Sequence, residues 1–253
     1  MKRTLSYLPN LITLLNLLFG CVAIVFALQG LTLFAGYCIM AAAVFDFCDG
    51  LLARLLNAYS ETGKQLDSLS DMVSFGVAPS AMLYIVMSRA LAPHIAGDLS
   101  TIGWELFAFF PFLLTLFSAL RLAKFNVDTR QSEQFLGLPT PANALLVASF
   151  LMYAVAHTAL DAYITPLGIC IAVVLLSAFL VMEIPMLALK FKGFAWQPNL
   201  PRYCFIILCV IVFIAVLLAR QEWTLSIVLI ILLYILYSIL LTMLSKLYKT
   251  SKS

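Results

Sequence analysis

The sequence predicts an all-α protein: a polytopic membrane bundle of about eight transmembrane helices with a short N-terminal interfacial helix. Hydrophobic residues make up 64% of the 253 residues, charged residues make up 11%, and the mean hydropathy is +1.06. About 25% of the residues in a typical soluble domain are charged, so the composition excludes that class. The charges are also unevenly placed, because long charge-free segments alternate with short charged ones.

The charge-free segments give the expected helices in chain order. Residues 1–10 carry Lys2 and Arg3 ahead of apolar residues, which predicts a short helix at the headgroup level. Residues 4–45 contain no charged residue and are long enough to cross a membrane twice, with Gly30 as the natural break. Six later spans are expected over residues 72–88, 106–120, 134–156, 162–182, 203–219 and 223–245, the third of these beginning effectively after Pro141.

The basic residues predict how this bundle is oriented. Thirteen of the fifteen Lys and Arg residues fall on one face of the arrangement, and only Arg89 and Arg220 fall on the other. Loops rich in Lys and Arg stay on the cytoplasmic side of a membrane. We therefore expect the face with the thirteen basic residues to be cytoplasmic, in an integral protein of a bacterial or archaeal cell membrane. We also expect one membrane domain over residues 1–253 and no nucleic-acid partner.

Residues 46–71 hold four aspartates between apolar segments, where charge is costly and usually functional. Asp46 and Asp49 lie one turn apart on one expected helix, and Asp67 and Asp71 lie one turn apart on the next. A loop near residues 57–62 would let the two helices aim all four acids into one cleft. Unneutralised carboxylates repel one another, and their hard oxygens suit Mg²⁺, Mn²⁺ or Ca²⁺, so this pattern favours a site for two divalent ions.

Three neighbours of these acids extend the site. Gly50 and Ala53 leave one face of the helix without bulk, and Arg54 offers a planar donor group suited to phosphate. The alternative is a polar hairpin at the membrane surface, with the acids paired to Arg54 and Lys64. Two basic residues do not balance four acids, so the ligand site is the favoured interpretation.

The pattern D-x-x-D-G-x-x-A-R-x8-G-x-x-x-D-x-x-x-D over residues 46–71 resembles the signature of the CDP-alcohol phosphotransferases, integral membrane enzymes of phospholipid synthesis. The resemblance implies Mg²⁺ or Mn²⁺ as cofactor, with two ions, and a homodimer. It also implies residue roles. Asp46, Asp49, Asp67 and Asp71 would be metal ligands, Asp71 would alternatively be the catalytic base, and the cytidine diphosphate portion would contact Asp49, Gly50, Ala53, Arg54 and Gly63.

A second polar stretch, residues 121–141, is expected on the same side as the acids. Its sequences RLAKFN and GLPTPA, together with LPNLITLLN near the N-terminus, are similar to the phosphatidylserine synthase branch of the family. That resemblance implies transfer of the phosphatidyl group from CDP-diacylglycerol to L-serine, giving phosphatidylserine and CMP. The serine or the lipid phosphate would then be bound by Arg121, Lys124, Asn126 and Thr140. By spacing alone, an ordinary basic flank of a membrane helix is equally compatible with this stretch.

Two other functions remain open from the sequence. The same chemistry with another alcohol, such as glycerol 3-phosphate or an inositol derivative, requires only a different acceptor pocket. A more remote alternative is a secondary transporter that uses membrane-embedded acids for ion coupling. The acids lie near a helix end and not at the middle of a span, which disfavours transport.

Overall fold

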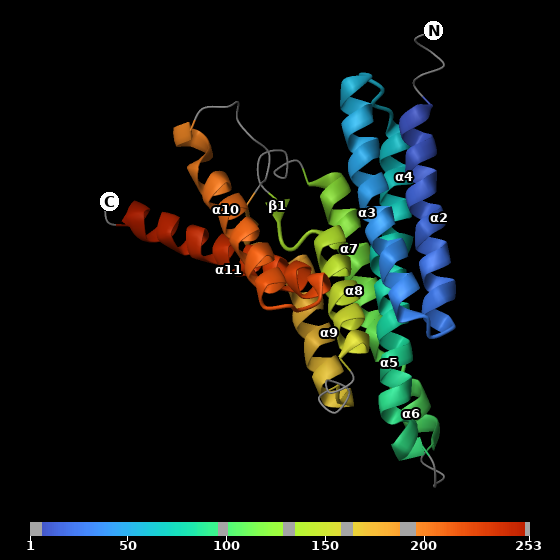
Figure 1. The fold of residues 1–253 in the computed structure, drawn as a ribbon. Coiled ribbons are helices and arrows are strands. Elements are labelled where there is room, and N and C mark those ends of the chain that lie inside the picture. Colours follow the sequence, from blue (N-terminus) through green and yellow to red (C-terminus); the bar gives the residue numbers. More distant parts are fainter. Residues whose placement is uncertain (1–6, 96–100, 129–134, 158–163, 188–195, 251–253) are drawn as a thin grey trace.

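The chain folds into a bundle of long helices, with the last two leaning away from the others (Figure 1). The structure is a computed structural model, which describes residues 7–95, 101–128, 135–157, 164–187 and 196–250. In chain order its elements are α2 (Leu8–Leu28), α3 (Thr32–Leu55), α4 (Glu61–Asp71), the π-helix η1 (Met72–Val77), α5 (Ala78–Ile95), α6 (Thr101–Phe107), the 3₁₀ helix η2 (Phe110–Phe112), α7 (Leu113–Val127), β1 (Phe135–Leu136), α8 (Thr140–Ala156), α9 (Pro166–Val181), β2 (Pro185–Met186), α10 (Trp196–Leu218) and α11 (Trp223–Thr250).

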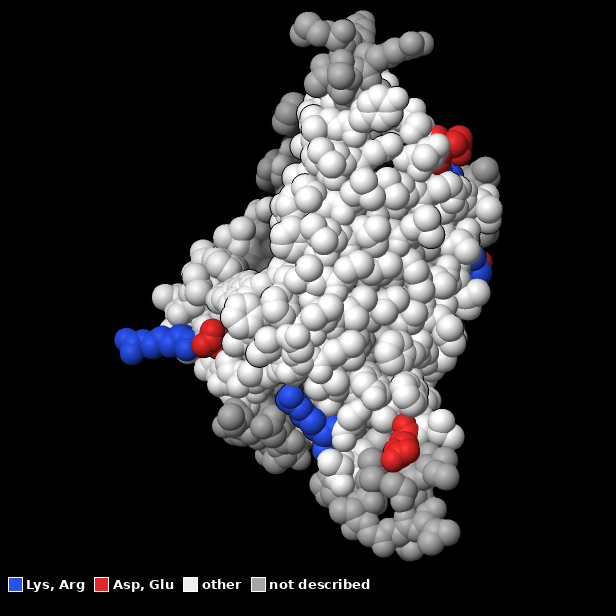
Figure 2. Space-filling model, turned by 90° about the vertical axis from the view of Figure 1, so that its right-hand side faces the viewer, with Lys and Arg blue, Asp and Glu red and all other residues white. Residues whose placement is uncertain are grey.

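This architecture confirms the predicted class, an integral membrane helical bundle. Within the described residues, five helical stretches are long and apolar enough to cross a membrane, namely Leu8–Leu28, Glu61–Ala92, Gly103–Val127, Asn199–Leu218 and Trp223–Ser245. Helices α8 and α9 are apolar but shorter, and α3 has 24 residues. Each expected span therefore lies on a helix, while the count of eight crossings stays a prediction. Figure 2 shows a broad surface with charged residues only near its margins, as contact with lipid requires.

The N-terminal half begins with a hairpin of α2 and α3, which turns at Gly30 as the sequence predicted. Small buried residues, including Ala23 and Ala27 on α2 and Ala35 on α3, let the two helices approach closely. The predicted interfacial helix over residues 1–10 is not tested as such, because residues 1–6 lie outside the described part and α2 already begins at Leu8.

The acids Asp67 and Asp71 belong to the same helical run as the third expected span. Helix α4 passes through η1 directly into α5, and the π-helical turn begins immediately after Asp71. Widened turns of this kind leave backbone groups in need of partners, and the carbonyl of Gly76 accepts hydrogen bonds from Ser80 Oγ at 2.8 Å and Thr115 Oγ1 at 3.0 Å. The sequence analysis did not foresee this turn.

A short ribbon, also absent from the sequence analysis, joins two loops on one side of the bundle. Phe135 pairs with Met186, and Leu136 pairs with Pro185, in antiparallel register. Helix α11 holds the ribbon through two hydrogen bonds to Leu187: the Leu187 N–H donates to Ser238 Oγ at 3.1 Å, and Tyr234 Oη donates to the Leu187 carbonyl at 3.1 Å. The ribbon therefore connects the loop after α7 to the last helix.

Gly137, at the end of this ribbon, is a position where only glycine fits. Its φ is +74°, and a Cβ added there would lie 2.7 Å from the carbonyl oxygen of Leu180. We expect Gly137→Ala to destabilise the protein by about 1–3 kcal/mol, because the backbone conformation and the contact are both unfavourable for alanine. The measurement is thermal unfolding of the purified protein in detergent. Gly103→Ala on α6 is the matched control, since no atom lies within 4 Å of its added Cβ, and equal unfolding temperatures for both variants would contradict the expectation.

Candidate active site

Three of the four acids meet where the end of α3 lies beside α4. Single carboxylate oxygens of Asp46, Asp49 and Asp67 all lie within 4.8 Å of one another. Asp49 is buried, with 6% of its surface exposed, and Asp46 and Asp67 are partly buried. The hairpin expected from the sequence thus does bring acids from two helices to one place, because the loop between Leu55 and Glu61 is short.

Asp71 lies one helical turn deeper and is 7% exposed. Its Oδ1 accepts a hydrogen bond from Asn16 Nδ2 at 3.2 Å, and its charge interacts with those of Asp46 and Asp67. Asn16 is fully buried on α2, and its backbone carbonyl accepts a hydrogen bond from Ser74 Oγ at 2.9 Å. Asn16 was not predicted to take part in the site, although an amide in an uncharged membrane span is itself a signal of a polar partner.

The acid cluster fits a divalent cation. Carboxylate oxygens this close together repel one another unless a cation or a proton separates them. Asp49 Oδ2 is buried and has no hydrogen-bond partner in the described part of the chain, so it offers a free ligand atom. Lys64, which the alternative interpretation paired with the acids, instead donates from Nζ to the backbone carbonyl of Asn126 at 2.9 Å. Hard oxygen donors with an unused lone pair are what Mg²⁺ and Mn²⁺ require.

A cleft of about 510 Å³ opens beside these acids between α2, α3 and α4. It contains four of the five residues predicted to contact a cytidine diphosphate group, and Gly50 faces open space, since no atom lies within 4 Å of an added Cβ. Arg54 is exposed and is not among the lining residues. The lining residues are Pro9, Asn10, Thr13, Asp49, Gly50, Ala53, Ala58, Tyr59, Ser60, Glu61, Gly63, Lys64 and Asp67.

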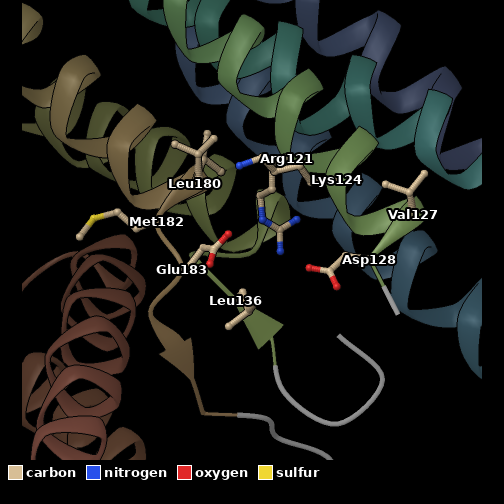
Figure 3. Close-up of a pocket in the computed structure, with 9 residues that line it drawn as sticks. Arg121, Lys124, Val127, Asp128, Leu136, Leu180, Met182 and Glu183 are labelled. Carbon is tan, nitrogen blue, oxygen red and sulfur yellow. The ribbon is translucent and has the colours of Figure 1, made fainter. Parts of the chain in front are cut away.

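The acceptor-side residues predicted from the sequence do not all share one pocket. Arg121 is 7% exposed, and its Nη1 donates to Thr140 Oγ1 at 3.3 Å. Arg121 and Lys124 line a second pocket, of about 170 Å³ (Figure 3). Asn126 lies elsewhere, because its Nδ2 donates to Ser68 Oγ at 2.8 Å and its carbonyl accepts from Lys64, which ties α7 to α4.

Electrostatics relate the second pocket to the acids. The charge of the Arg121 guanidinium, which lines this pocket, interacts with that of the buried Asp71 carboxylate. The remaining walls of the pocket are formed by residues from the end of α7, the ribbon and the end of α9, namely Val127, Asp128, Leu136, Leu180, Val181, Met182 and Glu183. None of the ribbon residues was predicted to take part in a site.

Together, the apolar bundle and its buried carboxylate cluster define an integral membrane protein with a site suited to divalent cations. Residues 6–189 match the family model of the CDP-alcohol phosphatidyltransferases. The chain belongs to this family, whose phosphotransferases depend on divalent metal ions. Helices α10 and α11 lie outside the matched residues.

Several relatives carry the name CDP-diacylglycerol–serine O-phosphatidyltransferase. A protein of Helicobacter pylori (strain J99) is 36% identical over 55% of this chain and 54% of the relative. A Mycobacterium leprae protein is 35% identical over 72% of this chain and 58% of the relative, and a Bacillus subtilis protein is 36% identical over 58% of this chain and 77% of the relative. The chain thus spans little more than half the length of the Helicobacter and Mycobacterium relatives.

The cation site can be tested without turnover. Asp67→Asn removes one charged ligand from the cluster, so we expect Mn²⁺ to bind at least roughly tenfold more weakly, as loss of even a supporting group costs a metal site that much. Electron paramagnetic resonance of free Mn²⁺ titrated with purified protein measures this affinity. Glu105→Gln on α6 is the control, because α6 lies at the end of the bundle opposite to the α3–α4 loop (Figure 1). Unchanged Mn²⁺ affinity in Asp67→Asn would exclude Asp67 as a ligand.

Proposed function

We propose that this protein transfers the phosphatidyl group of CDP-diacylglycerol to L-serine, giving phosphatidylserine and CMP. The observation that carries the proposal is the cluster of three carboxylates within 4.8 Å of one another beside a cleft of about 510 Å³. The serine hydroxyl would attack the phosphorus that carries the diacylglycerol, its proton would pass to a base, and CMP would leave. Relatives named for this reaction support the choice of serine.

Asp46, Asp49 and Asp67 would hold the divalent cations, with Asp71 as either a further ligand or the catalytic base. Two bound Mg²⁺ or Mn²⁺ ions would neutralise the diphosphate and stabilise the departing phosphate. The chain supplies the positions of these ligands from α3 and α4, which both pack against α2, so little reorganisation is needed when the substrate binds.

Asp71 is also placed to take the proton of the serine hydroxyl. It is the most deeply buried of the acids on α4, and Asn16 fixes the orientation of its carboxylate through the 3.2 Å hydrogen bond. A base held in one orientation beside the attacking group accelerates proton transfer. Arg121, whose charge interacts with Asp71, would keep this carboxylate next to the acceptor pocket.

The cleft would hold the cytidine diphosphate portion of the donor. Gly50, Ala53 and Gly63 leave room along its walls, and Asp49 belongs both to the lining of the cleft and to the acid cluster. Arg54 is exposed, so it would reach the diphosphate from the mouth of the cleft. In this proposal the nucleotide would be bound from the water while the acyl chains of the donor remain in the lipid.

We also propose that the site faces the cytoplasm of a bacterial or archaeal cell, that residues 1–253 form one membrane domain, and that the protein is a homodimer. The distribution of basic residues supports the first point. The matched relatives come from bacteria and from an archaeon, Methanocaldococcus jannaschii. Cross-linking in native membranes would test the dimer.

Another alcohol acceptor is the main alternative. A phosphate-bearing acceptor would need additional basic residues near the cleft, and Lys190 and Lys192, which the sequence offered for this, lie outside the described residues. On α10, Arg202 Nη1 donates to Asn199 Oδ1 at 3.1 Å. No observation favours transport over transfer, and membership of this family disfavours it.

The proposal is tested by incubating purified protein with CDP-diacylglycerol, labelled L-serine and Mg²⁺ or Mn²⁺. We expect labelled phosphatidylserine and an equal amount of CMP, both abolished by a chelator. Asp71→Asn should lower kcat by roughly 10²–10⁴-fold, the range for loss of a general base, while Mn²⁺ still binds. Faster CMP release with glycerol 3-phosphate than with serine would refute the choice of acceptor.

Substitution of Gly50 is expected to have opposite effects on the stability of the protein and on its affinity for the donor. Alanine is preferred over glycine inside a helix by about 1 kcal/mol, so Gly50→Ala should raise the stability of α3. The added methyl group would protrude into the cleft, so the KM for CDP-diacylglycerol should rise roughly tenfold with little change in the KM for serine. Gly103→Ala controls for the helix-propensity effect. An unchanged KM for the donor would show that the nucleotide does not occupy this cleft.

A further inference from the structure

The pocket of about 170 Å³ beside Arg121 has an unusual balance of charge. Its nine lining residues include two basic ones, Arg121 and Lys124, and two acidic ones, Asp128 and Glu183, while the other five are apolar. Figure 3 shows the carboxylates of Asp128 and Glu183 on either side of the guanidinium of Arg121. The formal charge of the pocket lining is therefore zero, unlike that of the neighbouring acid cluster.

The charged groups come from two separate parts of the chain. Arg121 and Lys124 lie one turn apart on α7, and Asp128 caps the end of the same helix, where its N–H donates to the Lys124 carbonyl at 2.9 Å. Glu183 lies between α9 and β2, on the opposite wall. The pocket thus lies where the end of α9 packs against α7.

Backbone hydrogen bonds hold that opposite wall in place. The Gly137 N–H donates to the Ile184 carbonyl at 3.0 Å, and the Leu138 N–H donates to the Phe179 carbonyl at 2.8 Å. These bonds and the β1–β2 pairing hold the backbone both before and after Glu183. On the α7 wall, Arg121 is 93% buried, and its Nε has no hydrogen-bond partner in the described part of the chain. An unpaired buried donor is costly, so a ligand atom is expected there.

We propose that this pocket binds a small zwitterionic amino acid, with Asp128 and Glu183 recognising its ammonium group and Arg121 and Lys124 its carboxylate. The inference rests on the proposed function and deepens it, because it assigns the residues that select the acceptor. A phosphate-bearing alcohol would bring negative charge against two carboxylates, and a neutral alcohol would offer no charge to complement either the two acidic or the two basic groups. The volume of about 170 Å³ suits a small molecule and not a nucleotide.

The position of the pocket gives the bound amino acid a direction. Arg121 contacts Thr140 at 3.3 Å, and its charge interacts with that of Asp71. In the proposed binding mode the carboxylate of the amino acid is anchored at Arg121 and its side-chain hydroxyl is directed toward Asp71. Arg121 would then serve both recognition of the acceptor and access of its hydroxyl to the base.

The test compares three acceptors that differ in one group each: L-serine, 3-hydroxypropanoate, which lacks the ammonium group, and ethanolamine, which lacks the carboxylate. We expect Asp128→Asn and Glu183→Gln each to raise the serine KM by roughly tenfold, the effect of losing one charge-assisted hydrogen bond. The KM for CDP-diacylglycerol should not change, and 3-hydroxypropanoate should lose nothing. Serine should consequently lose most of its advantage over 3-hydroxypropanoate, and Glu105→Gln should behave as wild type.

A different outcome would overturn the inference. If the two acids served only to neutralise Arg121 and Lys124, both variants would bind serine and 3-hydroxypropanoate more tightly. Asp128→Glu and Glu183→Asp, which keep the charge, should restore most of the serine affinity, and failure of both to do so would also count against the assignment. Saturation-transfer NMR of the two ligands gives the same comparison if a variant binds but does not turn over.

Failure of the proposed function is a separate result. Wild-type protein that released CMP with glycerol 3-phosphate but not with serine would refute the reaction before any variant is made. Wild-type protein that used serine, with Asp128→Asn and Glu183→Gln unchanged in serine KM, would leave the reaction intact and refute only the ammonium site.

Discussion

Mutual repulsion among the carboxylates at the end of α3 and along α4 is the constraint on which the structure depends. Three of these groups approach within 4.8 Å in a chain that is otherwise 64% hydrophobic. In a medium of low polarity such an arrangement is unfavourable unless positive charge is supplied. Lys64, the basic residue that lines the cleft, does not supply it, because its Nζ donates to the Asn126 carbonyl. The cluster of Asp46, Asp49 and Asp67 is therefore suited to binding cations.

The surrounding fold keeps the acids together through close packing and a few buried polar contacts. Gly20 on α2 allows the backbone at Ser74 to approach, since an added Cβ would lie 2.8 Å from the Ser74 Cα. Ser74 lies in the π-helical turn, hydrogen-bonds to the Asn16 carbonyl, and so fixes the residue that orients Asp71. Turns of this type are frequent at functional sites, because they change the direction of side chains on an otherwise regular helix.

Much of this arrangement follows from local sequence rules. Charge-free length locates the helices, Gly30 marks the first turn, and the spacing of Asp46, Asp49 and Asp67 places them on facing helices. Other features depend on contacts between distant residues, which local patterns do not encode. Phe135 pairs with Met186, 51 positions later, and this pairing forms the wall that carries Glu183. The family resemblance grouped Asn126 with Arg121, whereas in the structure Asn126 Nδ2 donates to Ser68 Oγ on another helix.

The central claim is that acids from two neighbouring helices bind cations at the membrane boundary. The most direct measurement is an anomalous difference map from crystals of the protein grown with Mn²⁺ and a cytidine diphosphate compound. The account predicts Mn²⁺ peaks within coordination distance of Asp46, Asp49 and Asp67, with the nucleotide in the cleft beside Gly50. A map with no peak among these carboxylates, from crystals in which the nucleotide is clearly bound, would contradict it.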